Sequence, residues 1–137
     1  MAHAKFPLEV LTPEGEVFNE EVEMISTKTG LGSIGILARH EALLATLVPT
    51  ELRIYRTEDD VVRFAQAEGY LQFADNRALV LVEEAIAPQA LDRELYETKL
   101  SEARAVAGRA AEDSEERARA LRDIRRYEAF IEVADAR

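Results

Sequence analysis

The spacing of the apolar residues changes once along this chain, close to Pro88. Before Pro88, apolar and polar residues alternate in short runs, as at Phe6, Leu8 and Val10, and this alternation is typical of strands with one buried face. After Pro88, four apolar residues recur at steps of four, three and four: Tyr96, Leu100, Ala103 and Ala107. That is the spacing of one helix face. Because proline cannot occupy a central strand, the sequence predicts strands before this point and helices after it.

The part before Pro88 predicts an antiparallel β-sandwich. Its strand-like runs are separated by turn sequences, namely TPEG at residues 12–15, TEDD at 57–60 and ADNR at 74–77. The strongest run is ALVLVEEA at residues 78–85. Short strands with turn chemistry between them are typical of a sandwich or barrel. Residues 1–86 are therefore expected to form one β-sandwich domain.

Residues 87–137 are expected to form an antiparallel α-helical hairpin. Asp92 is suited to cap the first helix and Ser114 to cap the second. The second helix carries an apolar stripe of five residues: Leu121, Ile124, Tyr127, Ile131 and Ala134. Two helices of this length are marginal in water by themselves, so the hairpin must pack on the sandwich, pack on a partner, or move between the two. The predicted fold class is α+β.

The composition excludes several classes of protein. The chain has no cysteine, which excludes a disulfide framework, a thiolate zinc site and a cysteine nucleophile. A net charge of −10 argues against nucleic acid as a partner, because contacts to phosphate need a basic surface. No apolar run is long enough for a signal peptide or a membrane span, so membrane association is expected only through a partner.

Candidate catalytic and metal-binding residues are few. His40 lies next to Glu41, but neighbours in an extended chain point to opposite faces and do not form an acid–base pair. His3 is the only other histidine, so no metal site is expected. The glycines near His40 lack the lysine and hydroxyl of a phosphate-binding loop and are expected to shape a turn. We interpret His40 as a structural residue hydrogen-bonded in that turn.

Arginines are concentrated on the second predicted helix. At about 100° per residue, four of them are expected on one arc, apart from the apolar stripe: Arg119, Arg122, Arg125 and Arg126. This arc is either a solvated face, partly neutralised by neighbouring acidic residues, or a basic surface that binds an acidic surface of another protein. The pattern alone favours neither.

Four segments, in this order along the chain, resemble the epsilon subunit of bacterial F-type ATP synthases. The most specific is GSIGILARHEALL at residues 32–44, which is similar to the G-x-[LM]-G-I-[LY]-P-x-H-A-P-L-L turn of that family. Residues 8–25 are similar to its opening strands, and residues 69–82 to its G-G-F-x-E-V…V-x-V-L block. Leu91 and Asp92 stand where its helical hairpin begins. The resemblance covers nearly the whole chain.

The chain also departs from the pattern of that family. Ala38 replaces the usual proline, and Glu68 replaces the first glycine of the G-G pair. Some members bind ATP through I/L-D-x-x-R-A, but here Leu95 and Tyr96 stand at the R-A positions. Losing the arginine removes a charge-assisted phosphate contact. No cofactor is therefore expected, regulatory ATP is disfavoured, and Asp92 is left as a doubtful nucleotide contact.

The resemblance implies a non-catalytic subunit of the central stalk of a proton-translocating enzyme. The sandwich would bind the gamma subunit and the ring of membrane c subunits, and the hairpin would inhibit ATP hydrolysis from the catalytic head. The turn facing gamma and the ring would contain Gly32, Ser33, Gly35, Arg39, His40 and Glu41. The arginine arc would face the beta subunits, beside alpha. Such a protein is peripheral, at the cytoplasmic face of the bacterial cell membrane.

A second interpretation remains open from the residues alone. A small β-sandwich can be a free-standing protein that binds a ligand or carbohydrate, with the helical hairpin as a dimerisation arm. A hydrolase is a third interpretation, and the sequence offers it no identifiable nucleophile–base pair.

Overall fold

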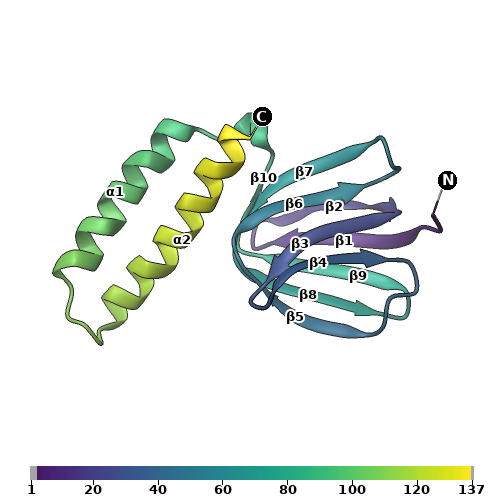
Figure 1. Cartoon of the computed structure of the whole chain (residues 1–137), viewed down its shortest axis with the longest axis horizontal. Coiled ribbons are helices and arrows are strands. Elements are labelled where there is room, and N and C mark those ends of the chain that lie inside the picture. Colours follow the sequence, from purple (N-terminus) through teal and green to yellow (C-terminus); the bar gives the residue numbers. More distant parts are fainter. Residues whose placement is uncertain (1–2, 137) are drawn as a thin grey trace.

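A computed structural model describes residues 3–136 as a β-sandwich followed by a helical hairpin (Figure 1), which confirms the predicted α+β fold class. The elements are β1 (Phe6–Thr12), β2 (Gly15–Val22), β3 (Met24–Thr29), β4 (Gly32–Leu37), β5 (Leu43–Leu47), β6 (Thr50–Tyr55), β7 (Val61–Gln66), β8 (Gly69–Ala74), β9 (Arg77–Val82), β10 (Ala85–Ile86), the 3₁₀ turn η1 (Pro88–Ala90), α1 (Arg93–Arg109) and α2 (Glu115–Asp135).

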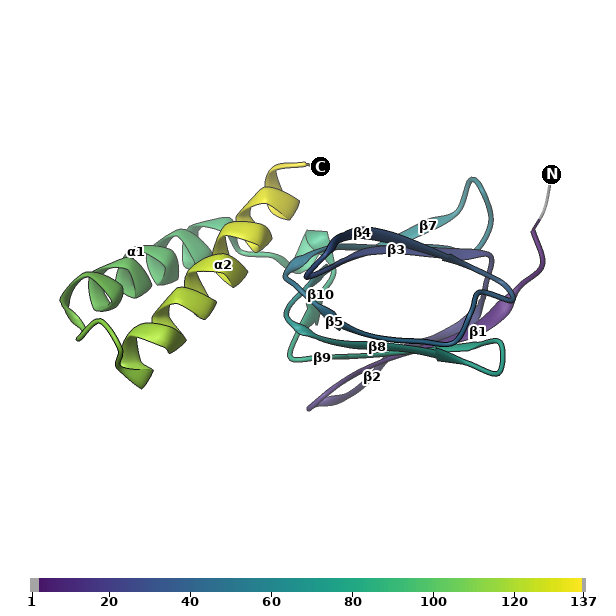
Figure 2. The same ribbon diagram turned by 60° about the horizontal axis from the view of Figure 1, so that its bottom comes forward.

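The ten strands form one sheet that folds over on itself into two layers. Its order is β10-β7-β6-β3-β5-β8-β9-β1-β2, with β4 paired to the free side of β3. Figure 2 shows β3, β4 and β7 in one layer and β5, β8 and β9 in the other. A single pair, Thr29 with Leu47, joins β3 to β5 between the layers. The expected antiparallel arrangement holds for every pair but one, since β1 and β9 run parallel.

The sandwich core lies between the two layers and is built by the predicted alternation. Phe6, Leu8 and Val10 of β1 point inward and are fully buried, while Pro7 and Glu9 between them are partly exposed. Phe6 and Phe73 meet edge to face across this core, with ring centroids 5.5 Å apart. This core contains residues of the sandwich only, so its side chains are buried without the helices.

The predicted turn at residues 32–44 is partly wrong. Gly32–Leu37 is the strand β4, which forms a hairpin with β3, and the tight turn between them consists of Gly30 and Leu31. Glycine is needed at Gly32, where φ is +125°. The glycine spacing suggested a loop, but Ile34 and Ile36, on either side of Gly35, face the sandwich core and hold this segment in the sheet. Within residues 32–44, only residues 38–42 connect strands.

The two helices begin where their predicted caps stand. The Asp92 side chain accepts a hydrogen bond from the Leu95 backbone N–H, and the Ser114 hydroxyl accepts one from that of Arg117. On α1, three residues of the predicted stripe are buried, namely Tyr96, Leu100 and Ala103.

The predicted stripe on α2 is correct in part: Ala134 is buried, and Tyr127 and Ile131 pack against the cluster that contains it. The buried residues of α2 are Ala120, Phe130, Val133 and Ala134. Leu121, Ile124 and Ile131 are only partly buried. The reason is that α2 contacts both α1 and the sandwich strands β6 and β7, so its buried face is set by two neighbours rather than one.

Candidate functional site

Arg39, His40 and Glu41 lie in the β4–β5 connection, at the end of the sandwich away from the helices (Figure 1). Arg39 has φ of 66°, and its backbone N–H donates to Asn76 Oδ1 at 2.7 Å, which ties this connection to the β8–β9 turn. His40 Nδ1 lies 2.8 Å from the Glu41 carbonyl oxygen. A carbonyl can only accept, so Nδ1 is the hydrogen donor in this contact. His40 packs edge to face on Phe73, with ring centroids 5.9 Å apart, so its contacts are structural.

The glycine-rich part of the predicted turn lies along the sandwich rather than at this end. Gly32, Ser33 and Gly35 are exposed residues of β4. The structure therefore does not gather the six predicted residues into one loop, although β4 and the connection after it are continuous in the chain.

An apolar row, exposed at Tyr70 and Leu81, crosses the outer face of the layer that contains β5, β8 and β9, called the second layer below. Sequence reasoning missed this row. Leu11, Leu81 and Tyr70 are neighbours across β1, β9 and β8. Tyr70 and Leu81 remain 55% and 42% exposed, and Leu44 on β5 is 73% exposed. Exposed apolar patches of this kind mark surfaces that bind other proteins. The available signal was the run ALVLV in β9, which is apolar on both faces of the strand.

The four predicted arginines do not lie in one environment. Arg119, Arg122 and Arg125 are exposed on α2, but Arg126 is only partly exposed and turns toward the sandwich. Arg126, Phe130 and Val133 are spaced by four and three residues and so share one helix face. Arg122 and Arg119 continue this face toward the start of α2, whereas Arg125 lies off it. The four arginines still fall within roughly 120° around α2, and the difference from the prediction is that Arg126, at one side of this arc, faces the sandwich instead of solvent.

Arg126 forms the polar part of the junction between hairpin and sandwich. Its guanidinium pairs with Glu68, in the β7–β8 connection, and its Nη1 donates to Glu84 Oε1 at 3.0 Å. Burial lowers the pKa of Arg126, but the hydrogen bond to Glu68 and the charges of Glu68 and Glu84 outweigh it and raise this pKa above its usual value. Arg126 is therefore charged at every physiological pH.

An apolar cluster forms the rest of the junction. Phe130, Val133 and Ala134 of α2 pack with Ala65 and Ala67 of the sandwich, with Leu91 just before α1, and with Tyr96 in its first turn. Phe130 is fully buried, and its ring meets that of Tyr96 edge to face at 5.3 Å. On the sandwich side the cluster contains the small residues Ala65 and Ala67, with the partly buried Ile86 of β10 packed against it, so few large apolar side chains of the sandwich take part. Burial raises the pKa values of Tyr96 and Tyr127.

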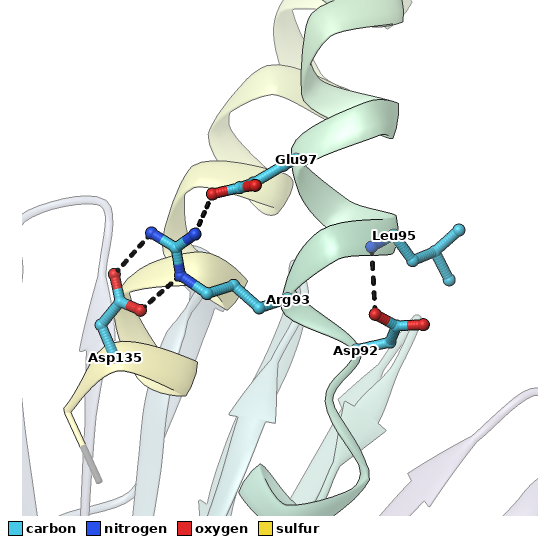
Figure 3. Close-up of polar contacts among 5 residues, drawn as sticks. All are labelled: Asp92, Arg93, Leu95, Glu97 and Asp135. Carbon is cyan, nitrogen blue, oxygen red and sulfur yellow. Dashed lines mark hydrogen bonds and ion pairs between the residues drawn. The ribbon is translucent and has the colours of Figure 1, made fainter.

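Side-chain contacts already occupy the start of α1, where the family's nucleotide motif would lie (Figure 3). Asp92 Oδ1 accepts the Leu95 N–H at 3.1 Å as a helix cap. Arg93 pairs with Glu97 and donates through Nε to Asp135 Oδ1 at 2.5 Å, joining α1 to the end of α2. This hydrogen bond lowers the pKa of Asp135. Asp92 is thus held as a helix cap, with no arginine at position 95 or 96 to meet a phosphate.

Within residues 3–136, no group of three or more His, Cys, Asp or Glu side chains is placed to hold a metal ion. Over the same residues, neither helix is both long and apolar enough to cross a bilayer.

Comparison with known proteins identifies relatives for both parts of the chain. The family model described as "ATP synthase, Delta/Epsilon chain, beta-sandwich domain" matches residues 5–88. The ATP synthase epsilon chain of Persephonella marina is 38% identical over 130 residues, which is 95% of this chain and 91% of that protein. The ATP synthase epsilon chain of Herpetosiphon aurantiacus is 35% identical over 133 residues, or 95% and 94% of the two chains.

Solved structures share the fold. One chain in a cryo-EM structure of the Euglena gracilis mitochondrial ATP synthase (OSCP/F1/c-ring) superposes with a TM-score of 0.79 at 22% identity, covering 98% of this chain and 82% of that one. A chain from the central stalk and c-ring structure of the Tetrahymena thermophila enzyme gives 0.62 at 19% identity, covering 98% and 99%. From the family match and the relatives that span sandwich and hairpin alike, the chain belongs to the ATP synthase delta/epsilon family.

Proposed function

We propose that this chain is the epsilon subunit of an F-type ATP synthase, a non-catalytic part of its central stalk. The observation that carries the proposal is the match to epsilon chains over 95% of the sequence, hairpin included. Family membership also removes the support for a free-standing carbohydrate-binding protein or a hydrolase.

The sandwich, residues 1–86, is the part that anchors the subunit to the gamma subunit and the c-ring. Exposed Tyr70 and Leu81, with the partly exposed Leu11 beside them, support a protein partner on the outer face of the second layer, because covering apolar side chains removes them from water and is favourable. The exposed β4 residues and the β4–β5 connection with His40 are the second surface offered to these partners.

The hairpin, residues 87–137, is the regulatory part. Its small junction with the sandwich supports an element that can detach, since a switch needs two states of similar free energy. Arg119, Arg122 and Arg125 are already exposed for an acidic surface of the beta subunits, and Arg126 joins them on detachment. In the detached state the hairpin extends along gamma, beside alpha and beta, and inhibits ATP hydrolysis.

The subunit reaches the membrane through the complex. It is placed peripherally at the cytoplasmic face of the cell membrane, in a proton-translocating enzyme. Nucleotide is not part of the proposal, because Asp92 serves as a helix cap and Leu95 and Tyr96 stand where the ATP-binding motif has arginine and alanine.

The direct test compares ATP hydrolysis by the assembled head with gamma and either the full chain or residues 1–87. The shortened chain retains the whole sandwich core. The proposal expects both chains to bind, and hydrolysis to be faster with the shortened one. Equal rates with both chains bound would remove the inhibitory role, and failure of the full chain to bind the gamma-containing head would remove the stalk role as well.

A further inference from the structure

Glu68 is a departure from the family pattern, and the proposed function does not explain it. It stands where the related block has the first glycine of a pair, in the short connection between β7 and β8. A carboxylate there needs a partner or solvent, because an unpaired charge close to an apolar junction is unfavourable. The structure supplies the partner from a residue 58 positions away, Arg126 of α2.

Three segments meet at this point. Glu68 comes from the β7–β8 connection, Glu84 from the β9–β10 connection, and Arg126 from the middle of α2. The Arg126 side chain is 20% exposed, against 30% for Glu68 and 37% for Glu84. The two carboxylates hold both terminal nitrogens of one guanidinium, while its buried Nε has no partner within residues 3–136. These contacts tie the hairpin to the sandwich beside the apolar cluster.

The contact is suited to being exchanged rather than permanent. It is partly open to solvent on all three side chains, so water and ions can reach it during separation. Two carboxylates serve one arginine, so an acidic surface of a partner could offer Arg126 the same kind of pairing. Arg122 lies one helix turn away on the same face and is exposed, so such a partner would meet it first.

We propose that Arg126, Glu68 and Glu84 form a latch, in which Arg126 holds the hairpin on the sandwich and, once released, exchanges its two carboxylates for an acidic protein surface. The latch rests on the proposed function for its role in the complex. Its residues, however, can be tested in the isolated full-length chain, where the head and gamma are absent.

The test uses the double variant Glu68→Gln with Glu84→Gln, and Glu83→Gln as its matched control. Glu83 adjoins Glu84 and is exposed, and it has no ion pair within the described residues. Because the chain lacks cysteine, Asp59→Cys and Glu112→Cys allow spin labels at the far end of the sandwich and at the hairpin tip. Pulsed EPR then gives the fraction of chains with the hairpin detached.

The latch predicts that the double variant raises the detached fraction about tenfold, and that Glu83→Gln leaves it unchanged. The thermal transition of the sandwich should persist in the double variant, which separates hairpin release from misfolding. An unchanged detached fraction in the double variant, or an equal rise in Glu83→Gln, would overturn the latch.

The exchange step has its own measurement, with a poly-glutamate peptide as the acidic probe. The double variant should bind the peptide about tenfold more tightly than the parent chain, and adding Arg126→Gln should abolish this gain. Equal binding by the parent chain and the double variant would overturn the exchange. These results come from the isolated chain, so they fail or succeed separately from inhibition of the assembled head.

Discussion

Replacing Phe130 by alanine should detach the hairpin while leaving the sandwich folded. The Phe130 ring is fully buried where α1, α2 and the sandwich meet, and it contacts Tyr96 edge to face. Removing a buried phenylalanine ring costs about 3–5 kcal/mol, and the lower end applies here because a small junction can close partly over the gap. About 3 kcal/mol corresponds to roughly a hundredfold change in an equilibrium constant.

The structure determines which part of the chain loses this free energy of stabilisation. Phe130 belongs to the junction cluster, and the sandwich core contains no helical residue. The cost should therefore fall on the docking of the hairpin, not on the unfolding of the strands. Native-state hydrogen exchange separates the two, because amides of α2 exchange through hairpin release and those of β8 and β9 through unfolding of the sandwich.

The expected result is about a hundredfold faster exchange in α2, with strand amides such as those of Leu71 and Val80 little changed. Leu95→Ala is the control, since Leu95 is 45% exposed on α1 and outside the cluster. If Phe130→Ala left α2 as protected as before, or lowered the protection of β8 and β9 to the same extent, the separation of junction and core would be refuted.

Three further predictions address the core, the helices and the apolar row. Gly69→Ala should destabilise the sandwich by about 3 kcal/mol in denaturant unfolding, because a Cβ at Gly69 would lie 1.9 Å from the Leu81 carbonyl oxygen; unchanged stability would contradict this close approach. Burial raises the pKa values of Tyr96 and Tyr127 in the folded state. Each neutral tyrosine therefore stabilises the folded hairpin in full below its unfolded pKa near 10, and this contribution is lost as the pH rises through the folded pKa. The ultraviolet titration should therefore have a component above pH 10 that shrinks in Tyr96→Phe, and an identical curve for that variant would count against the burial. Tyr70→Ser with Leu81→Ser should weaken binding to gamma about tenfold or more in a pull-down or calorimetric titration, whereas Arg63→Ser on the other layer should not; equal binding by both would show that gamma does not use this face.

Local patterns predicted the β-sandwich, the hairpin and both helix caps. Alternation at Phe6, Leu8 and Val10 depends on one strand and its buried face. The caps at Asp92 and Ser114 depend on hydrogen bonds to backbone N–H groups three residues further along the chain. Such features need no knowledge of distant parts of the chain.

The features that the sequence did not predict depend on distant neighbours. β4 has the glycines of a turn, but its pairing with β3 and the burial of Ile36 make it a strand. The buried face of α2 is set by docking on strands that precede it by more than fifty residues. The pairing of Arg126 with Glu68 likewise spans 58 residues, and helical periodicity alone carries no information about it.

The central claim is that the hairpin detaches from the sandwich and then inhibits ATP hydrolysis. It is tested most directly in the assembled complex. The spin labels at positions 59 and 112 would be measured in the gamma-containing head while hydrolysis is inhibited, and compared with the isolated chain. The account predicts that the docked distance dominates in the isolated chain and that a longer distance dominates in the inhibited complex. A complex in which hydrolysis is inhibited while every chain keeps the docked distance would contradict it.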